Sequence, residues 1–231
     1  SGGSYAGEVQ VRAEERDPTS DERERAIEIA HEMVKEREAD GDREAFVTEA
    51  KEVKDGADIQ LSTNKLGRAL SKRLVEEFGG SFEEYATLVT EDSDGNEVYR
   101  VTFSVRLPRY QPGEIIDPED GDGPVLVTSV RGNLKGIRLA SGDRYEARFD
   151  EGDAPDALRL GEREDAQSTT VVAVEDEHAV QVLDPETFET VSIPRPDFFN
   201  TDADEVSVLK SRSGLYMVPE EGESAAGDDD A

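Results

Sequence analysis

Several residue types that carry common chemistry are absent or scarce in this sequence of 231 residues. It contains no cysteine, no tryptophan and only two histidines. The absence of cysteine excludes disulfides and thiolate metal sites within the chain. No apolar run approaches the roughly 20 residues that a membrane-spanning helix needs, and no signal peptide is recognisable. We therefore expect a cytoplasmic protein.

Bases are also scarce, because 26 Lys and Arg stand against 56 Asp and Glu, for a formal net charge of −30. The acids are spread along every segment rather than gathered in one tail. At low ionic strength such a charge strains a compact fold by self-repulsion. In molar salt the Debye length falls to about 3 Å and the repulsion is screened. The composition therefore predicts a halophilic protein. An acidic disordered chain is disfavoured because apolar β-branched residues alternate along many segments.

The search for catalytic motifs finds almost nothing. His31 falls within an expected helix and His178 within an expected hairpin turn, and neither has a partner at metal-ligand spacing. The nucleophile-elbow, P-loop, dinucleotide-binding and zinc-protease motifs are missing. The stretch "DSDGNE" at 92–97 begins like a calcium loop, but its twelfth position would be Phe103, so we interpret it as a turn. The sequence predicts a protein that is not an enzyme and has no cofactor in this chain. A hydrolase with an unrecognised carboxylate site is the remaining catalytic alternative.

Residues 1–107 carry the pattern of an α+β domain. An alternating strand at 5–12 is followed by a helix that opens at a Ser/Thr/Asp start signal and ends near Gly41. We predict a second short helix at about 42–54, a strand at 57–62 and a helix at 63–80 that ends at two glycines. A hairpin with a turn at 94–96 completes the order β-α-α-β-α-β-β.

From residue 108 onward the helical period disappears and short alternating runs follow at even spacing. This pattern is typical of small β-barrels. A faint internal echo at an offset of 43 residues, with Glu146 over Glu189, supports two β units. We predict one small barrel at 108–163, a second at 164–219, an acidic linker at 150–165 between them, and a disordered acidic tail at 220–231.

Three stretches contain bases and no acid, against the acidic trend of the rest. They are 62–73, 98–113 and 124–142. Their candidate RNA-binding residues are Lys65, Arg68, Lys72 and Arg73 in the first, Arg100, Arg106 and Arg109 in the second, and Arg131, Lys135 and Arg138 in the third. Together they suggest contact with a polyanion. The competing interpretations are an ordinary solvated helix face for the first stretch and a simple glycine turn for the third. The tyrosines of the second stretch could stack on bases, but packing on a sheet is preferred.

Four segments, taken in order, resemble a known family. They are "SGGSYAGEVQVRA", "DIQLSTNKLGRALSKRLVEEFGGSFEEYATLV", "YRVTFSVRLPRYQPGEII" and "VQVLDPETFETVSIPRP". The chain is similar over about 1–218 to the large-ribosomal-subunit export adapter family, nonsense-mediated decay protein three, in its archaeal, haloarchaeal branch. The resemblance implies an assembly factor that contacts rRNA and proteins of the large ribosomal subunit. It also implies an SH3-like and then an OB-like barrel, similar to initiation factor five A.

The resemblance further implies a zinc module with paired cysteines before the "SGGSY" segment, and this chain carries no such cysteines. Zinc is therefore expected only in a module outside this chain. The nuclear export signals of eukaryotic members are not recognisable here. We predict a non-catalytic ribosome-assembly factor with no membrane and no small-molecule substrate. The alternative is a barrel-type translation factor that binds tRNA or mRNA on the ribosome.

Overall fold

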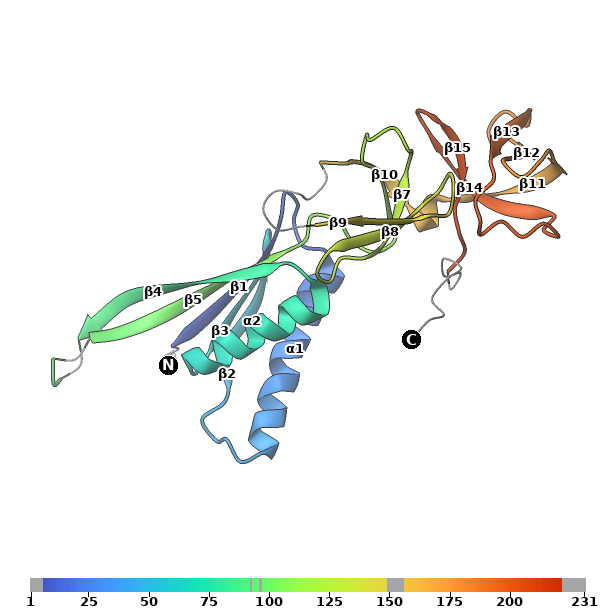
Figure 1. Cartoon of the computed structure of the whole chain (residues 1–231). Coiled ribbons are helices and arrows are strands. Elements are labelled where there is room, and N and C mark those ends of the chain that lie inside the picture. The colour runs from blue at the N-terminus through green and yellow to red at the C-terminus, as the bar shows by residue number, and fades with distance from the viewer. Residues whose placement is uncertain (1–5, 92, 96, 149–155, 222–231) are drawn as a thin grey trace, which may run out of the picture. The chain divides into compact units, whose positions relative to one another are not determined.

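The computed structural model describes residues 6–91, 93–95, 97–148 and 156–221 (Figure 1). The chain divides into two compact units, Ser1–Arg109 and Tyr110–Ala231. The described residues are mostly β, with two α-helices and three five-stranded sheets. Most of the acidic tail predicted to be disordered, from 222 onward, lies outside the described residues. The three domain boundaries read from the sequence remain a prediction.

The first unit is a single sheet with both helices on one of its faces (Figure 1). Its strands lie in the order β2-β3-β1-β5-β4, and only the β1–β5 pair is parallel. The strands are β1 (Gly7–Ala13), β2 (Val47–Val53), β3 (Gly56–Leu61), β4 (Ser81–Glu91) and β5 (Glu97–Leu107), and the helices are α1 (Ser20–Ala39) and α2 (Asn64–Phe78). The inward side chains of β1, β3 and β5 meet the apolar stripes of both helices in one core.

Both helices begin where the sequence predicts. Thr19 caps α1 and forms a capping box with Glu22, while the Thr63 hydroxyl accepts a hydrogen bond from the backbone N–H of Leu66 in α2. Helix α2 stops at Gly79, whose φ of 81° favours glycine. Leu66, Leu70 and Leu74 recur at helical spacing along α2, and all three are buried in the core.

The helix predicted at about 42–54 is wrong. Residues Val47–Val53 form the strand β2, which pairs with β3 through a tight hairpin turn. The turn ends at Gly56, where an added Cβ would lie 1.7 Å from the carbonyl oxygen of Val11, so this position accepts only glycine. Three consecutive apolar residues at 45–47 were too short a pattern to distinguish a helix from an edge strand. The observed order of elements is β-α-β-β-α-β-β.

The second unit contains two five-stranded sheets, in the orders β10-β6-β7-β8-β9 and β13-β12-β11-β14-β15. The first sheet consists of β6 (Glu114–Asp117), β7 (Val125–Ser129), β8 (Leu134–Arg138), β9 (Arg144–Ala147) and β10 (Leu158–Glu162). The second consists of β11 (Gln167–Val174), β12 (Ala179–Leu183), β13 (Thr190–Pro194), β14 (Glu205–Ser211) and β15 (Gly214–Met217). A short 3-10 helix, η2 (Arg163–Asp165), lies between β10 and β11.

Part of the predicted linker at 150–165 is a structured element. Strand β10 pairs antiparallel with β6. In the sequence, the acids around Leu158, Leu160 and Gly161 made this segment look like a linker. Each sheet has its own buried cluster. A further cluster joins residues of both sheets, including Ile115, Leu126 and Leu209. The two sheets of this unit are therefore packed against each other.

Candidate nucleic-acid interface

Helix α2 carries the first basic stretch on the side away from the core. Leu66, Leu70 and Leu74 are at most 1% exposed and anchor the helix on the sheet. Lys65, Arg68 and Lys72 recur at helical spacing and are exposed. Since Lys65 and Lys72 are seven residues apart, they lie about 10 Å apart along the helix axis. The helix thus presents a short cationic row to solvent.

Two arginines of this stretch are paired with acids from other elements. The Arg68 guanidinium donates to both oxygens of Glu84 on β4, at 2.6 and 3.0 Å. Arg73 donates to both oxygens of Glu36 on α1, at 2.9 and 2.8 Å. These hydrogen bonds hold the pKa values of both carboxyls below their usual range. The first basic stretch contains no acid, but carboxylates from β4 and α1 fold against two of its arginines. Arg68 and Arg73 are therefore weaker candidates for RNA binding than the sequence suggests.

Lys65 and Lys72 differ from the arginines. Within the described part of the chain, neither ammonium has a carboxylate within 4.0 Å. Lys72 is near enough to Glu84 to help lower the pKa of that carboxyl, but it forms no ion pair there. Two exposed ammonium groups on a rigid helix, each able to donate three hydrogen bonds, are suited to phosphate oxygens.

The second basic stretch lies on the opposite face of the same sheet. On β5, Phe103 and Val105 point into the core shared with α2, so the alternate residues Arg100 and Arg106 point to the other side. Arg106 pairs with Glu14 at 3.1 Å, and Arg109 pairs with Glu15 at 3.1 Å. The structure does not bring the first and second stretches together, and one flat RNA surface cannot touch both.

The third basic stretch, in the second unit, contains one structural arginine. Arg138 donates to Asp120 (2.9 Å from Nη1) and to the carbonyl of Gly123 (3.0 Å), and its guanidinium lies 4.6 Å from the ring centroid of Tyr145. Its side chain is only 12% exposed. These contacts hold the loop before β7 to the end of β8 and leave few donors of Arg138 for a ligand. Arg131 and Lys135 are exposed at the other end of the β7–β8 hairpin, near the turn that joins the two strands.

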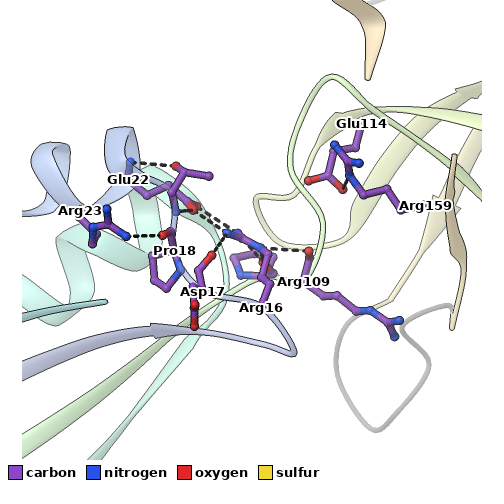
Figure 2. Close-up of polar contacts among 10 residues, drawn as sticks. Arg16, Asp17, Pro18, Glu22, Arg23, Arg109, Glu114 and Arg159 are labelled. Carbon is purple, nitrogen blue, oxygen red and sulfur yellow. Dashed lines mark hydrogen bonds and ion pairs between the residues drawn. The ribbon is translucent and has the colours of Figure 1, made fainter. Parts of the chain in front are cut away.

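A buried ion pair in the first unit has no counterpart among the sequence predictions (Figure 2). Arg16 pairs with both oxygens of Glu22, at 2.6 and 3.1 Å, and also donates to the carbonyls of Pro108 and Arg109. Glu22 is 7% exposed and accepts the backbone N–H of Thr19. The Thr-x-x-Glu capping motif was readable in the sequence, but the partner Arg16 was not. This network holds the end of β5 to the start of α1.

Figure 2 also shows Arg159 on β10 beside Glu114 on β6, where Nε lies 3.7 Å from Oε2. Glu114 is buried at 6% exposure, so this pair supports the β6–β10 contact within the second unit. Among the described residues, no group of three or more His, Cys, Asp or Glu is arranged to hold a metal ion. Within those same residues, neither helix is long and apolar enough to cross a bilayer.

Comparison with known proteins bears on the first unit most directly. Residues 4–107 match the family model described as NMD3, second domain. The match supports the NMD3 family. It spans the whole helix-and-sheet unit that presents Lys65 and Lys72, and a little under half of the chain.

One solved structure has a distant likeness to part of this chain. A solved structure of eukaryotic translation initiation factor 5A from Methanococcus jannaschii is 17% identical, with a TM-score of 0.32, and the alignment covers 48% of this chain and 87% of that one. A score this low does not assign a fold. The comparison with curated proteins gave no match.

Proposed function

We propose that this chain is a non-catalytic assembly factor of the large ribosomal subunit, and that Lys65 and Lys72 on α2 contact rRNA phosphates. The observation that carries the proposal is the match of residues 4–107 to the NMD3 second domain, with these two lysines exposed on its helix. Association with the large subunit is what the family resemblance implies. The lysines identify a surface that could provide it.

The geometry of α2 favours close phosphate contacts over long-range attraction. In molar salt the Debye length is about 3 Å, so a charge acts only on a phosphate that touches it. Lys65 and Lys72 have no carboxylate partner among the described residues to leave before binding. Arg68 lies between them, and Glu84 engages its Nε and Nη2, which leaves other guanidinium N–H donors for a second acceptor.

The remaining candidate residues have smaller roles in this proposal. Arg106 and Arg109 form ion pairs with carboxylates, and Arg138 stabilises the loop before β7. Lys135 and Arg131 are exposed and provide a secondary contact from the second unit. We also propose a cytoplasmic, halophilic archaeal protein whose two β units are SH3-like and OB-like barrels, with zinc held only by a module outside this chain.

Co-sedimentation with purified large ribosomal subunits in molar KCl tests the proposal. The variant Lys65→Gln/Lys72→Gln removes both charges and retains polar, helix-compatible side chains. We expect it to fold normally, because both side chains point away from the core, and to sediment less with the particle. Arg43→Gln/Lys54→Gln is the matched control, since it removes two exposed charges elsewhere in the same unit.

Equal loss in the two variants, or no loss in either, would overturn the role of α2. Failure of the unmodified chain to sediment with large subunits would overturn the proposed function as a whole. Association with translating ribosomes but not with isolated large subunits would favour the alternative, a translation factor that binds tRNA or mRNA.

A further inference from the structure

Phe188 stands out on the second unit as a large apolar side chain with no role in the fold. It lies in the 184–189 loop, between β12 and β13, and is 74% exposed, the highest value among the exposed large hydrophobic residues of the described chain. Its backbone has a φ of 59°, in the left-handed region that bulky residues rarely adopt. Asn or Gly would adopt this conformation more readily, so the fold gains nothing from a phenyl ring here.

The 184–189 loop is held in one conformation by its own hydrogen bonds. Asp184, at 8% exposure, accepts the backbone N–H groups of Glu186 (2.8 Å) and Thr187 (3.3 Å) through Oδ1. The N–H of Phe188 donates to the Asp184 carbonyl at 2.8 Å, and Lys210 on β14 reaches the Asp184 carboxylate at 3.3 Å. These contacts fix the backbone that carries the ring. A fixed aromatic side chain loses little freedom when it binds.

Charge around the ring identifies the kind of partner. Glu186 and Glu189 flank Phe188 and are exposed, and the nearby Lys210 is already engaged by Asp184 and Glu186. This local excess of carboxylates repels the phosphates of RNA. A second copy of the chain is disfavoured too, because acids outnumber bases by 56 to 26 and its surface would place further carboxylates in direct contact with Glu186 and Glu189. The complementary surface is a protein that is basic around an apolar pocket.

We propose that Phe188 is a docking anchor, inserted into an apolar pocket on a basic protein of the large ribosomal subunit, with Glu186 and Glu189 facing the basic rim. The proposal rests on the proposed function for the identity of the particle. Exposed aromatics that enter a pocket and lose all their water commonly dominate an interface. The α2 lysines and Phe188 would thus provide two contacts of different chemistry, one with rRNA and one with protein.

The test compares Phe188→Asn with Phe46→Asn in binding to purified large subunits at fixed molar KCl. Phe46 is a matched control, because it is also exposed, at 48%, but lies in the first unit. We expect Phe188→Asn to bind about 30-fold more weakly, as for a typical anchor residue. Its melting temperature should be unchanged or higher, because asparagine accepts the left-handed conformation. The control should bind like the unmodified chain.

A photoreactive benzoyl-phenylalanine at position 188 identifies the class of partner, and a cross-link to a protein of the subunit is the expected result. A cross-link only to rRNA, no cross-link to the particle, or equal binding by Phe188→Asn and the unmodified chain would overturn the anchor. If the unmodified chain binds the particle normally, any of these failures refutes the anchor and leaves the proposed function standing. If the unmodified chain does not bind, both proposals fail.

Discussion

Gly67 on α2 tests the packing that positions the lysine row. A Cβ added there would lie 2.5 Å from Cε2 and 2.8 Å from Cδ2 of Phe103, against an optimum of about 3.5–4.0 Å between carbons. The Phe103 ring is fully buried and has Phe82 as an aromatic neighbour, with ring centroids 6.5 Å apart. The ring therefore has little room to move aside. Gly67→Ala forces either the ring or the helix to shift.

Two opposing effects set the size of the change. Alanine is about 1 kcal/mol better than glycine inside a helix. Overpacking a tight core costs about 1–3 kcal/mol. We expect Gly67→Ala to lower the free energy of unfolding by about 1–2 kcal/mol, because the contact is with a fully buried ring rather than a flexible side chain.

Thermal and urea unfolding in molar KCl measure this change. Phe103→Leu removes the ring atoms that the added Cβ would strike. A double-mutant cycle with this variant therefore separates the overpacking against Phe103 from the higher helix propensity of alanine. Gly67→Ala should cost less in the Phe103→Leu background, or even stabilise it. If Gly67→Ala stabilises the unmodified chain, or costs the same in both backgrounds, the packing of α2 on β5 described above is wrong.

Three other predictions follow from the ion pairs and the net charge. Arg16→Met should lower the free energy of unfolding by about 3–5 kcal/mol, because it leaves the Glu22 carboxylate buried without its cation; a loss below about 1 kcal/mol in urea titration would contradict this. Glu36 and Glu84 have folded pKa values below the usual 4.5, so the stability they add is present above that value and is lost as pH falls through the lowered pKa. The melting temperature of a variant with both arginine partners changed to Gln should therefore fall less steeply in acid, and parallel curves would refute the pairs. With a net charge of −30, the melting temperature should rise from dilute to molar KCl, and no dependence on salt would contradict the halophile interpretation.

The elements that were predicted correctly have long, regular patterns of apolar residues in the sequence. Helix α2 has a cap, an apolar stripe of four-residue and three-residue steps, and a terminal glycine pair, and all of these appear in the structure. The short alternating runs after residue 108 became strands as expected. Strands β2 and β10 were missed because each lies at a sheet edge and carries charged residues among its apolar ones. β2 has no buried residue and β10 has one, so neither needs the regular apolar alternation by which a strand is recognised.

The candidate interface could be predicted only in part, because the sequence does not show which acids fold against which bases. Arg73 lies 37 residues after Glu36 along the chain, and Arg106 lies 92 residues after Glu14. The strand alternation that places Arg100 and Arg106 opposite α2 was visible in principle, but it had to be combined with the position of the helices. Glu22 in α1 is buried against Arg16, a partner that the spacing of charges along the helix does not indicate.

The dependence of binding on salt tests the central claim most directly. Each lysine that contacts a phosphate contributes about one to the slope of log affinity against log salt concentration. We expect the slope for large-subunit binding, measured over a series of KCl concentrations, to be shallower by about two for Lys65→Gln/Lys72→Gln than for the unmodified chain. The control Arg43→Gln/Lys54→Gln should keep the full slope. An unchanged slope in the α2 variant would show that Lys65 and Lys72 do not contact phosphate.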